Sequence, residues 1–294
     1  MVDGGIIRWA TTLMAAAAIC TAGPAPAENA PIPCPVDAKL ATLLAASDLV
    51  LMGRMNVPKQ GLADEARRPS PKYLDIPIEV ALVAKGESVG SATVRFYTQD
   101  SPYKPSNEAV LALAGEPALL FLTRGDYGAA GLNFAGYRPD ALTRATDPGV
   151  VAVRAEVSRQ TRIAASRPAG TMLPHFTEVR ALIARLGRVS GNRQQRVFDQ
   201  LEALGEAAVP AIIAQMDDRR SLRTQAISLV NHAPDAFEGM RHYGPEQVVD
   251  GLDAVLNQIT GESFGSIMNG GSDRRRATTV AGWRVYAADL RCSR

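Results

Sequence analysis

Residues 204–218 read LGEAAVPAIIAQMDD. The apolar residues of this stretch recur with the three- and four-residue spacing that places them on one face of a helix. Pro210 falls in the first turn of that helix, where its missing amide hydrogen breaks no bond. The apolar residues are Val209, Ile212, Ile213 and Met216. A helix this short is stable only when its apolar face packs on neighbours, so the stretch predicts one unit of a larger helical layer.

Helical spacing of apolar residues recurs on both sides of this stretch. Several of the segments end at a glycine, such as Gly187, Gly205 or Gly261, which is typical of helix C-termini. The predicted helices cover residues 175–186, 194–204, 222–230, 246–259 and 272–290.

The segment from Leu204 to Asp218, followed by Arg223-Thr-Gln-Ala226, resembles one HEAT repeat. The consensus of that family is Leu-Gly-x-x-Ala-Val-Pro-x-Leu-Ile-x-x-Leu-x-Asp and then Arg-x-x-Ala. The resemblance implies an all-α, HEAT-like domain of helical hairpins over residues 171–294, because stacked repeats bury each other's apolar faces.

The end of the chain resembles the segment that closes bacterial HEAT-like proteins. It has Ile-Thr-Gly-Glu-Ser-Phe-Gly at residues 259–265, followed by Trp283 in the last predicted helix. We expect Phe264 and Trp283 to pack together as a cap on the helical layer.

The first half has a different pattern. A short amphipathic helix is predicted over residues 37–47, with Asp37 as its capping residue. Runs of apolar and β-branched residues bounded by turn signals then predict strands, which suggests a small antiparallel barrel over residues 28–124. These strands cover residues 49–57, 76–86, 92–98 and 118–124.

Three of these segments resemble the bacterial members of the netrin/TIMP-like group. They are SDLVLMGRM at 47–55, IEVALVAKG at 78–86 and GEPALLFL at 115–122. The resemblance implies an OB-type five-stranded barrel. Animal members inhibit metalloproteinases through the amine of an N-terminal Cys, but Cys34 lies several residues inside the expected mature chain and the other family cysteines are missing. Protease inhibition is therefore an alternative role that the resemblance does not transfer.

Residues 125–170 predict a linker that contains one helix, at 149–165. This helix carries Arg154, Arg159 and Arg162 with only Glu156 opposing them. We interpret the three arginines as a solvated basic strip. The fold class predicted for the whole chain is α+β in two domains, a small antiparallel β-barrel followed by an all-α helical-hairpin domain.

Residues 1–27 have the pattern of a cleaved export signal. Arg8 is followed by a mainly apolar run at 9–19, which is too short to span a bilayer, and Ala25-Pro-Ala27 fits a cleavage site. Lipid attachment at Cys20 is not expected, because Ile19 stands where a small residue is needed. The sequence predicts a periplasmic or secreted protein whose mature chain has no transmembrane segment.

Removal of the signal leaves two cysteines, Cys34 and Cys292. In an oxidising compartment they can form one disulfide that joins the two ends of the mature chain, and the alternative is a pair of free thiols. A metal site is not expected, because the three histidines lack metal-ligand spacing.

Polar side chains that could bind a ligand or act as acids and bases are concentrated in one predicted loop. Arg241, His242, Tyr243 and Glu246 lie close together in sequence, and His232 lies nearby. They can form a binding loop or, in the alternative, the acid–base groups of a hydrolase built on His232, His242 and Glu246. A charged turn with further candidate binding residues contains Asp217, Arg219 and Arg220.

Gly261-Glu-Ser-Phe-Gly265 matches the nucleophile-elbow pattern, but a helix precedes Ser263 and no His follows it, so we predict no catalytic residue there. No cofactor is expected. The formal net charge of +2 gives no argument for nucleic-acid binding. The sequence therefore predicts a non-enzymatic module that binds a protein or peptide in the cell envelope.

Overall fold

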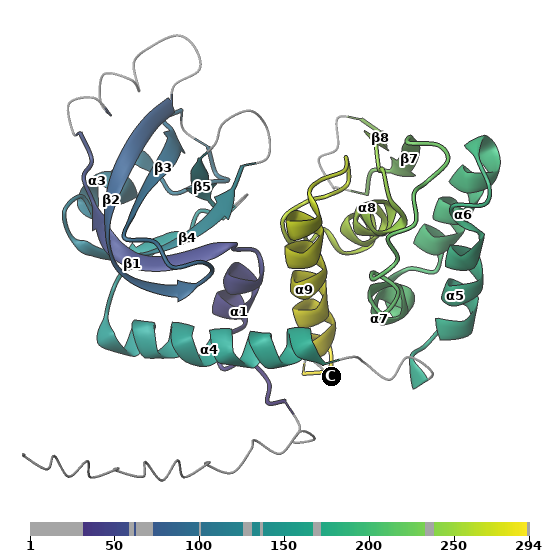
Figure 1. Ribbon diagram of the computed structural model, residues 1–294, viewed down its shortest axis with the longest axis horizontal. Coiled ribbons are helices and arrows are strands. Elements are labelled where there is room, and N and C mark those ends of the chain that lie inside the picture. Colours follow the sequence, from purple (N-terminus) through teal and green to yellow (C-terminus); the bar gives the residue numbers. More distant parts are fainter. Residues whose placement is uncertain are drawn as a thin grey trace, which may run out of the picture. The chain divides into compact units, whose positions relative to one another are not determined.

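The computed structural model describes residues 32–58, 62, 73–99, 101–125, 131–135, 138–166, 172–232 and 238–292. The predicted export signal, including Cys20, lies outside these residues. Figure 1 shows a β-barrel in the first half of the chain and mainly helices in the second half.

The barrel is built from five strands that form a closed sheet. Its strand order is β1-β2-β3-β5-β4, and β4 also pairs with β1. The strands are β1 (Leu49–Met55), β2 (Tyr73–Lys85), β3 (Ser91–Tyr97), β4 (Pro117–Arg124) and β5 (Leu132–Phe134). A sixth strand, β6 (Leu142–Arg144), pairs with β4, and the short helix α3 (Asn107–Ala112) lies between β3 and β4 in the chain.

All four predicted strands are present, and their alternating apolar residues explain the register. On β2 and β3, for example, Ile76 lies opposite Val94, and both side chains are buried. A shift of one residue would turn every apolar side chain of the pair outward, so burial of one face fixes the pairing.

Strand β5 closes the barrel and comes from the segment predicted as a linker. It pairs parallel to β3 and antiparallel to β4. Both β5 and β6 have only three residues. Strands this short carry almost no periodicity of their own, and they form here because the neighbouring strands offer unpaired backbone groups.

Three helices connect the barrel to the second half of the chain. They are α1 (Ala38–Ala45), α4 (Asp147–Ala165) and α9 (Asp273–Asp289), and each contacts the other two. Asp37 caps α1, as predicted, by accepting hydrogen bonds from the amides of Lys39 and Leu40.

The interpretation of α4 as an exposed basic helix was wrong for Arg159. Its guanidinium is buried, bonds the carboxylate of Glu156 through Nε at 2.8 Å, and pairs with Asp289 of α9 at 2.9 Å. Arg154 is exposed, as expected. Since α4 packs on both α1 and α9, it is a structural helix rather than a free connection.

Of the two alternatives that the sequence leaves open for Cys34 and Cys292, the structure has the disulfide. It joins the residues that precede α1 to those that follow α9. The loop that it closes spans 258 residues. In the chain-entropy account, a loop of this size restricts the unfolded chain by about 5 kcal/mol.

The second half contains four further α-helices in its described part. They are α5 (Phe176–Arg185), α6 (Gly191–Ala203), α7 (Val209–Ile213) and α8 (Val248–Thr260), and a 3-10 turn, Glu206–Ala208, leads into α7. The opening stretch therefore forms a helix, as predicted. Its residues Val209, Ile212, Ile213 and Met216 are all buried.

The helix predicted over residues 222–230 is wrong. Residues Ile227–Val230 form strand β7, which pairs with β8 (Met240–Tyr243) in a two-stranded sheet. The side chains of Ile227 and Leu229 are buried, whereas Val230 is exposed. This two-residue alternation is that of a strand, so the second half is not all-helical.

The aromatic cap predicted at the end of the chain is present. The rings of Phe264 and Trp283 lie edge to face with centroids 4.9 Å apart. Gly282 permits this approach, because a Cβ atom there would lie 2.4 Å from the Cβ of Phe264. As expected, a helix precedes Ser263: α8 ends at Thr260, and the following Gly261 has a left-handed conformation.

Candidate functional site

The β7–β8 hairpin holds most of the predicted binding loop. It is anchored by Gln195 of α6, whose side-chain amide bonds both the amide and the carbonyl of Ser228 at 3.0 and 2.6 Å. The outer end of the hairpin exposes the apolar side chains of Val230 and Met240, which are directly opposite each other.

The predicted binding residues on this hairpin form hydrogen bonds with different partners. The Nδ1 atom of His242 lies 2.8 Å from the hydroxyl of Ser228, and the hydroxyl of Tyr243 accepts a hydrogen bond from Gln258 at 2.6 Å. Burial raises the pKa of Tyr243, which keeps its hydroxyl neutral. Arg241 is exposed on the same strand.

The three groups of the hydrolase alternative are engaged separately. His232 lies 3.1 Å from Glu202, and His242 contacts Ser228. Glu246 pairs with Arg276 at 2.7 Å. Within the described residues, no hydrogen bond or ion pair joins any two of the three, so the contacts offer no shared acid–base site.

Two neighbouring loops bring together a group of arginines. The loop after α5 contains Gly187, whose carbonyl accepts a hydrogen bond from Arg223 at 3.1 Å, and the amide of Gly191 donates to Thr224 at 2.8 Å. We call the exposed arginines of these loops and of the first turn of α6 the arginine surface. They are Arg188, Arg193, Arg219, Arg220 and Arg223.

Arg220 holds the arginine surface together. Its guanidinium donates to the carbonyls of Ile183 and Leu186, both at 2.9 Å, and pairs with Asp218 at 2.6 Å. The hydrogen bonds to Asp218 raise the pKa of Arg220, so it stays charged. This predicted binding residue therefore mainly stabilises the loop, because its guanidinium is already engaged in contacts within the chain.

The acidic residues of the same loops are already paired. Asp217 binds Arg284 of α9 at 2.6 Å, and Asp218 binds Arg220. Within the described part of the chain, Arg188, Arg193 and Arg219 take part in no ion pair. The surface thus keeps an excess of positive charge.

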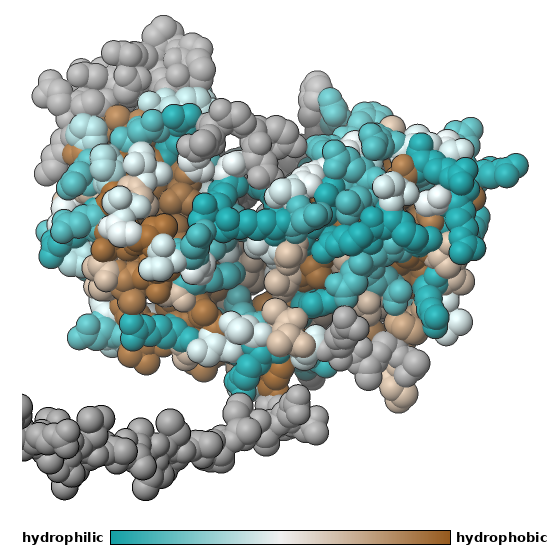
Figure 2. Space-filling model, viewed as in Figure 1, coloured by the Kyte–Doolittle hydropathy of each residue, from teal (hydrophilic) through white to brown (hydrophobic). Residues whose placement is uncertain are grey.

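The two halves of the molecule also differ in the surface that they present. In Figure 2, apolar residues gather over the barrel, whereas hydrophilic residues cover most of the visible face of the helical half. The charged candidates of the sequence all belong to the second half.

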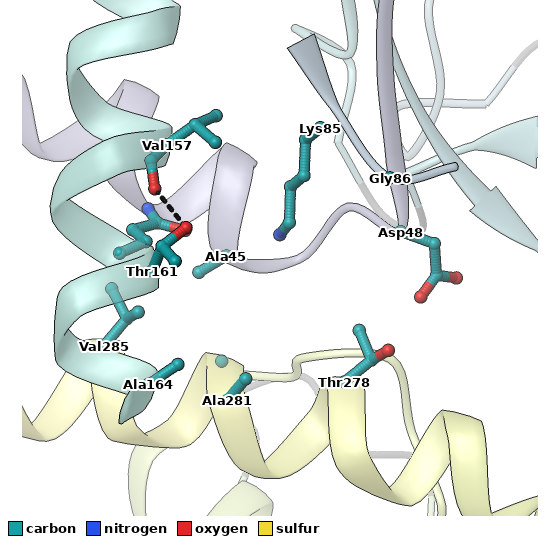
Figure 3. Close-up of a pocket in the computed structure, with 12 residues that line it drawn as sticks. Ala45, Asp48, Lys85, Gly86, Val157, Thr161, Ala164, Thr278, Ala281 and Val285 are labelled. Atoms are coloured by element: carbon teal, nitrogen blue, oxygen red, sulfur yellow. Dashed lines mark hydrogen bonds between the residues drawn. The ribbon is translucent and has the colours of Figure 1, made fainter. Parts of the chain in front are cut away.

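Sequence reasoning missed a cavity of about 200 Å³ between the barrel and the helices α1, α4 and α9. Figure 3 shows that Lys85, the last residue of β2, points its amine into this space. Gly86 follows with a φ of +95°, and a Cβ atom there would lie 2.7 Å from the carbonyl oxygen of Asp48. Glycine is therefore required at this turn, and it directs the end of β2 towards α1.

The amine of Lys85 is only partly compensated in this position. It donates a hydrogen bond to the carbonyl of Leu44 at 2.5 Å, near the C-terminus of α1. Burial lowers the pKa of the Lys85 ammonium to about 8, and the nearby carboxylate of Asp48 opposes this shift. A lysine at the end of an apolar strand and before a glycine is the only sequence signal for this feature.

No group of three His, Cys, Asp or Glu side chains in the described residues could hold a metal ion. None of the helices in the same residues is long and apolar enough to cross a membrane. The chain matches no protein-family model, no curated protein and no solved structure.

Proposed function

We propose that this chain is an exported, non-enzymatic binding protein of the bacterial cell envelope that holds an acidic segment of a partner protein. The observation that carries the proposal is the arginine surface, which has five arginines and two acidic residues, Asp217 and Asp218, that are both already paired. An unbalanced cluster of guanidinium groups favours carboxylate partners, because each can form paired hydrogen bonds with them.

Export is supported by the disulfide between Cys34 and Cys292. Structural disulfides persist mainly in oxidising compartments such as the periplasm. The apolar run at residues 9–19 is consistent with the same destination.

We also infer that the first half is an OB-type barrel and that the second half contains one HEAT-like unit. The order β1-β2-β3-β5-β4, with β4 returning to β1, supports an OB-type barrel. The α6–α7 pair supports a single HEAT-like unit, in which the strand β7 takes the place of a further helix. Both kinds of domain serve as binding modules in many settings, and the site rather than the fold must decide the function.

The arginine surface fits a peptide better than a small ligand. Its members come from two segments that lie side by side. One is residues 187–193, which comprise the loop after α5 and the first turn of α6, and the other is the loop at residues 219–224. An extended acidic segment can contact several of these side chains at once, whereas exposed ion pairs contribute little singly.

The test is direct binding of a short, fluorescein-labelled Glu-rich peptide to the purified exported chain, followed by fluorescence anisotropy. Arg188→Glu combined with Arg219→Glu should weaken binding at least about tenfold, because two attractive charges become repulsive. Neither side chain makes an ion pair in the described structure, so the variant should fold.

The matched control is Arg154→Glu combined with Arg180→Glu. It makes the same change of charge at exposed positions of α4 and α5. Binding should be retained in this variant and absent for a Gln-rich peptide of equal length. Equal loss in both variants, or stronger binding to a single-stranded oligonucleotide or to anionic lipid vesicles, would reject the acidic-peptide proposal.

A further inference from the structure

The cavity beside Lys85 has walls of two kinds. Most of the wall is formed by small apolar side chains from α1, α4 and α9, among them Ala45, Val157, Ala281 and Val285. Lys85 is the only basic residue among the twelve that line it, and Asp48 is the only other ionisable one. The cavity is therefore a small apolar space with one cationic group at its edge (Figure 3).

The other polar side chains of the wall already donate hydrogen bonds to backbone carbonyls. The hydroxyl of Thr161 donates to the carbonyl of Val157 at 2.9 Å, and that of Thr278 donates to Arg274 at 3.2 Å. The amide nitrogen of Gln160 donates to the carbonyl of Ala41 at 2.8 Å. An ammonium has three N–H groups, so Lys85 keeps donors for a ligand beyond its bond to Leu44.

Asp48 does not neutralise Lys85. Its carboxylate accepts a hydrogen bond from the amide of Arg124 at 2.9 Å, and Figure 3 shows it turned away from the Lys85 amine. The cavity thus contains a desolvated cation without a direct anionic partner.

We propose that this cavity binds a small aliphatic monocarboxylate, with its carboxylate on the Lys85 ammonium and its hydrocarbon chain against Val157, Ala281 and Val285. A volume of about 200 Å³ suits such a ligand. An apolar cavity of about 150 Å³ accommodates benzene, so roughly six carbon atoms fit here.

A bound carboxylate would stabilise the protonated, charged form of Lys85, which burial disfavours. A carboxylate beside a buried ammonium favours its protonated form, so ligand binding and proton uptake are coupled. Binding should weaken as the pH rises through about 8, the pKa of Lys85 in the empty cavity. Asp48 is the only other ionisable group on the wall, and its orientation away from the amine leaves Lys85 as the group that responds.

Lys85 also caps the C-terminus of α1 through the carbonyl of Leu44. A purely structural role would make the side chain important for stability and indifferent to carboxylates. Leu44 keeps a backbone hydrogen bond from the amide of Ser47, so removal of the amine leaves its carbonyl paired.

The experiment is calorimetric titration of the exported chain with sodium hexanoate, hexanol and hexylamine hydrochloride. Hexanoate should bind more tightly than hexanol, and hexylamine should not bind. Lys85→Met should weaken hexanoate binding at least about tenfold, because the ionic hydrogen bond is lost. Ala281→Phe should abolish binding by filling the cavity while the amine stays in place.

Lys39→Met is the matched control, since Lys39 is an exposed residue of α1 that does not line the cavity. It should bind hexanoate as the unchanged chain does. Absence of binding at millimolar hexanoate, equal binding of hexanol, or an unchanged affinity in Lys85→Met would overturn the proposal. The outcome is independent of the arginine surface, which contains none of the cavity residues.

Discussion

The barrel and the helical half bury different kinds of side chain. The barrel core is made of apolar residues such as Ile76, Leu120 and Phe121. In the described barrel strands, the one charged group that burial affects strongly is the amine of Lys85, which lies at the end of β2 and outside this core. Among the described residues of the helical half, three charged side chains are buried: Asp250, Asp253 and Arg276. The barrel is therefore held together by apolar packing, whereas the helical half also relies on buried charged groups.

The buried charges of the helical half act as connectors. The carboxylate of Asp250 accepts hydrogen bonds from the amides of Glu246 and Gln247 at the start of α8 and pairs with Arg276 of α9 at 2.8 Å. The carboxylate of Asp253 accepts hydrogen bonds from the indole of Trp283 at 2.7 Å and the amide of Ile267 at 2.8 Å.

This difference has a physical reason. A closed sheet satisfies its backbone groups by itself, so its core needs no polar side chains. Irregular loops between short helices leave amides unpaired, and buried carboxylates supply the missing acceptors. The helical half should therefore be the more sensitive of the two to changes of charge and pH.

The largest effect is expected for Arg276→Ala. Loss of this guanidinium leaves the buried carboxylate of Asp250 without its ionic partner, which should lower the free energy of unfolding by about 4 kcal/mol. Urea denaturation followed by circular dichroism measures this change. The control is Arg274→Ala, an exposed residue whose contact with Glu87 is long, at 3.9 Å, and it should change stability by less than about 0.5 kcal/mol. Similar losses in both variants would contradict the comparison.

The second effect concerns Asp253. Burial raises its pKa from 3.8 to about 6, against the hydrogen bonds from Trp283 and Ile267. A raised pKa in the folded state means that this residue stabilises the fold fully below about pH 3.8. This stabilisation is lost as the pH rises through about 6, and the difference corresponds to about 3 kcal/mol.

Asp253→Asn removes this titration and keeps one side-chain oxygen as an acceptor. As the pH rises from about 4 to about 7, the free energy of unfolding of the variant should increase relative to that of the unchanged chain. Urea denaturation at a series of pH values gives both stability profiles. Parallel profiles would show that Asp253 does not titrate in this range.

The smallest effect is expected in the barrel. Ile76→Val removes one methylene group from a fully buried site and should cost about 1 kcal/mol at any pH between about 4 and 7. Thermal unfolding followed by circular dichroism is sufficient to measure it. A loss that depends on pH would break the distinction between the apolar barrel and the charged helical half.

The first half of the chain was easier to predict than the second. The four longer strands and the Asp37 cap were predicted correctly, because alternation and capping depend on neighbours in sequence. The spacing of Leu222, Ala226 and Leu229 fits a helix, and the same segment also fits a strand that ends at Val230. For this reason the segment 222–230 was wrongly predicted to be a helix. Contact of β7 with α6 and α8 decides between the two.

The candidate sites were predicted unevenly for a related reason. Arg219 and Arg220 were singled out from their own turn, but Arg188 and Arg193 join them only because the loop after α5 and the first turn of α6 pack beside that turn. The interpretation of Arg159 was wrong because its partner Asp289 is distant in sequence.

The sequence by itself determined the helices and strands that repeat a clear period, the cap formed by Phe264 and Trp283, and the pair of cysteines available for a disulfide. Only the tertiary structure decided the closing strand β5, the hairpin β7–β8 and the cavity beside Lys85. The reason is that periodicity records which face of an element is buried, whereas the partner that buries it depends on contacts between segments far apart in the chain.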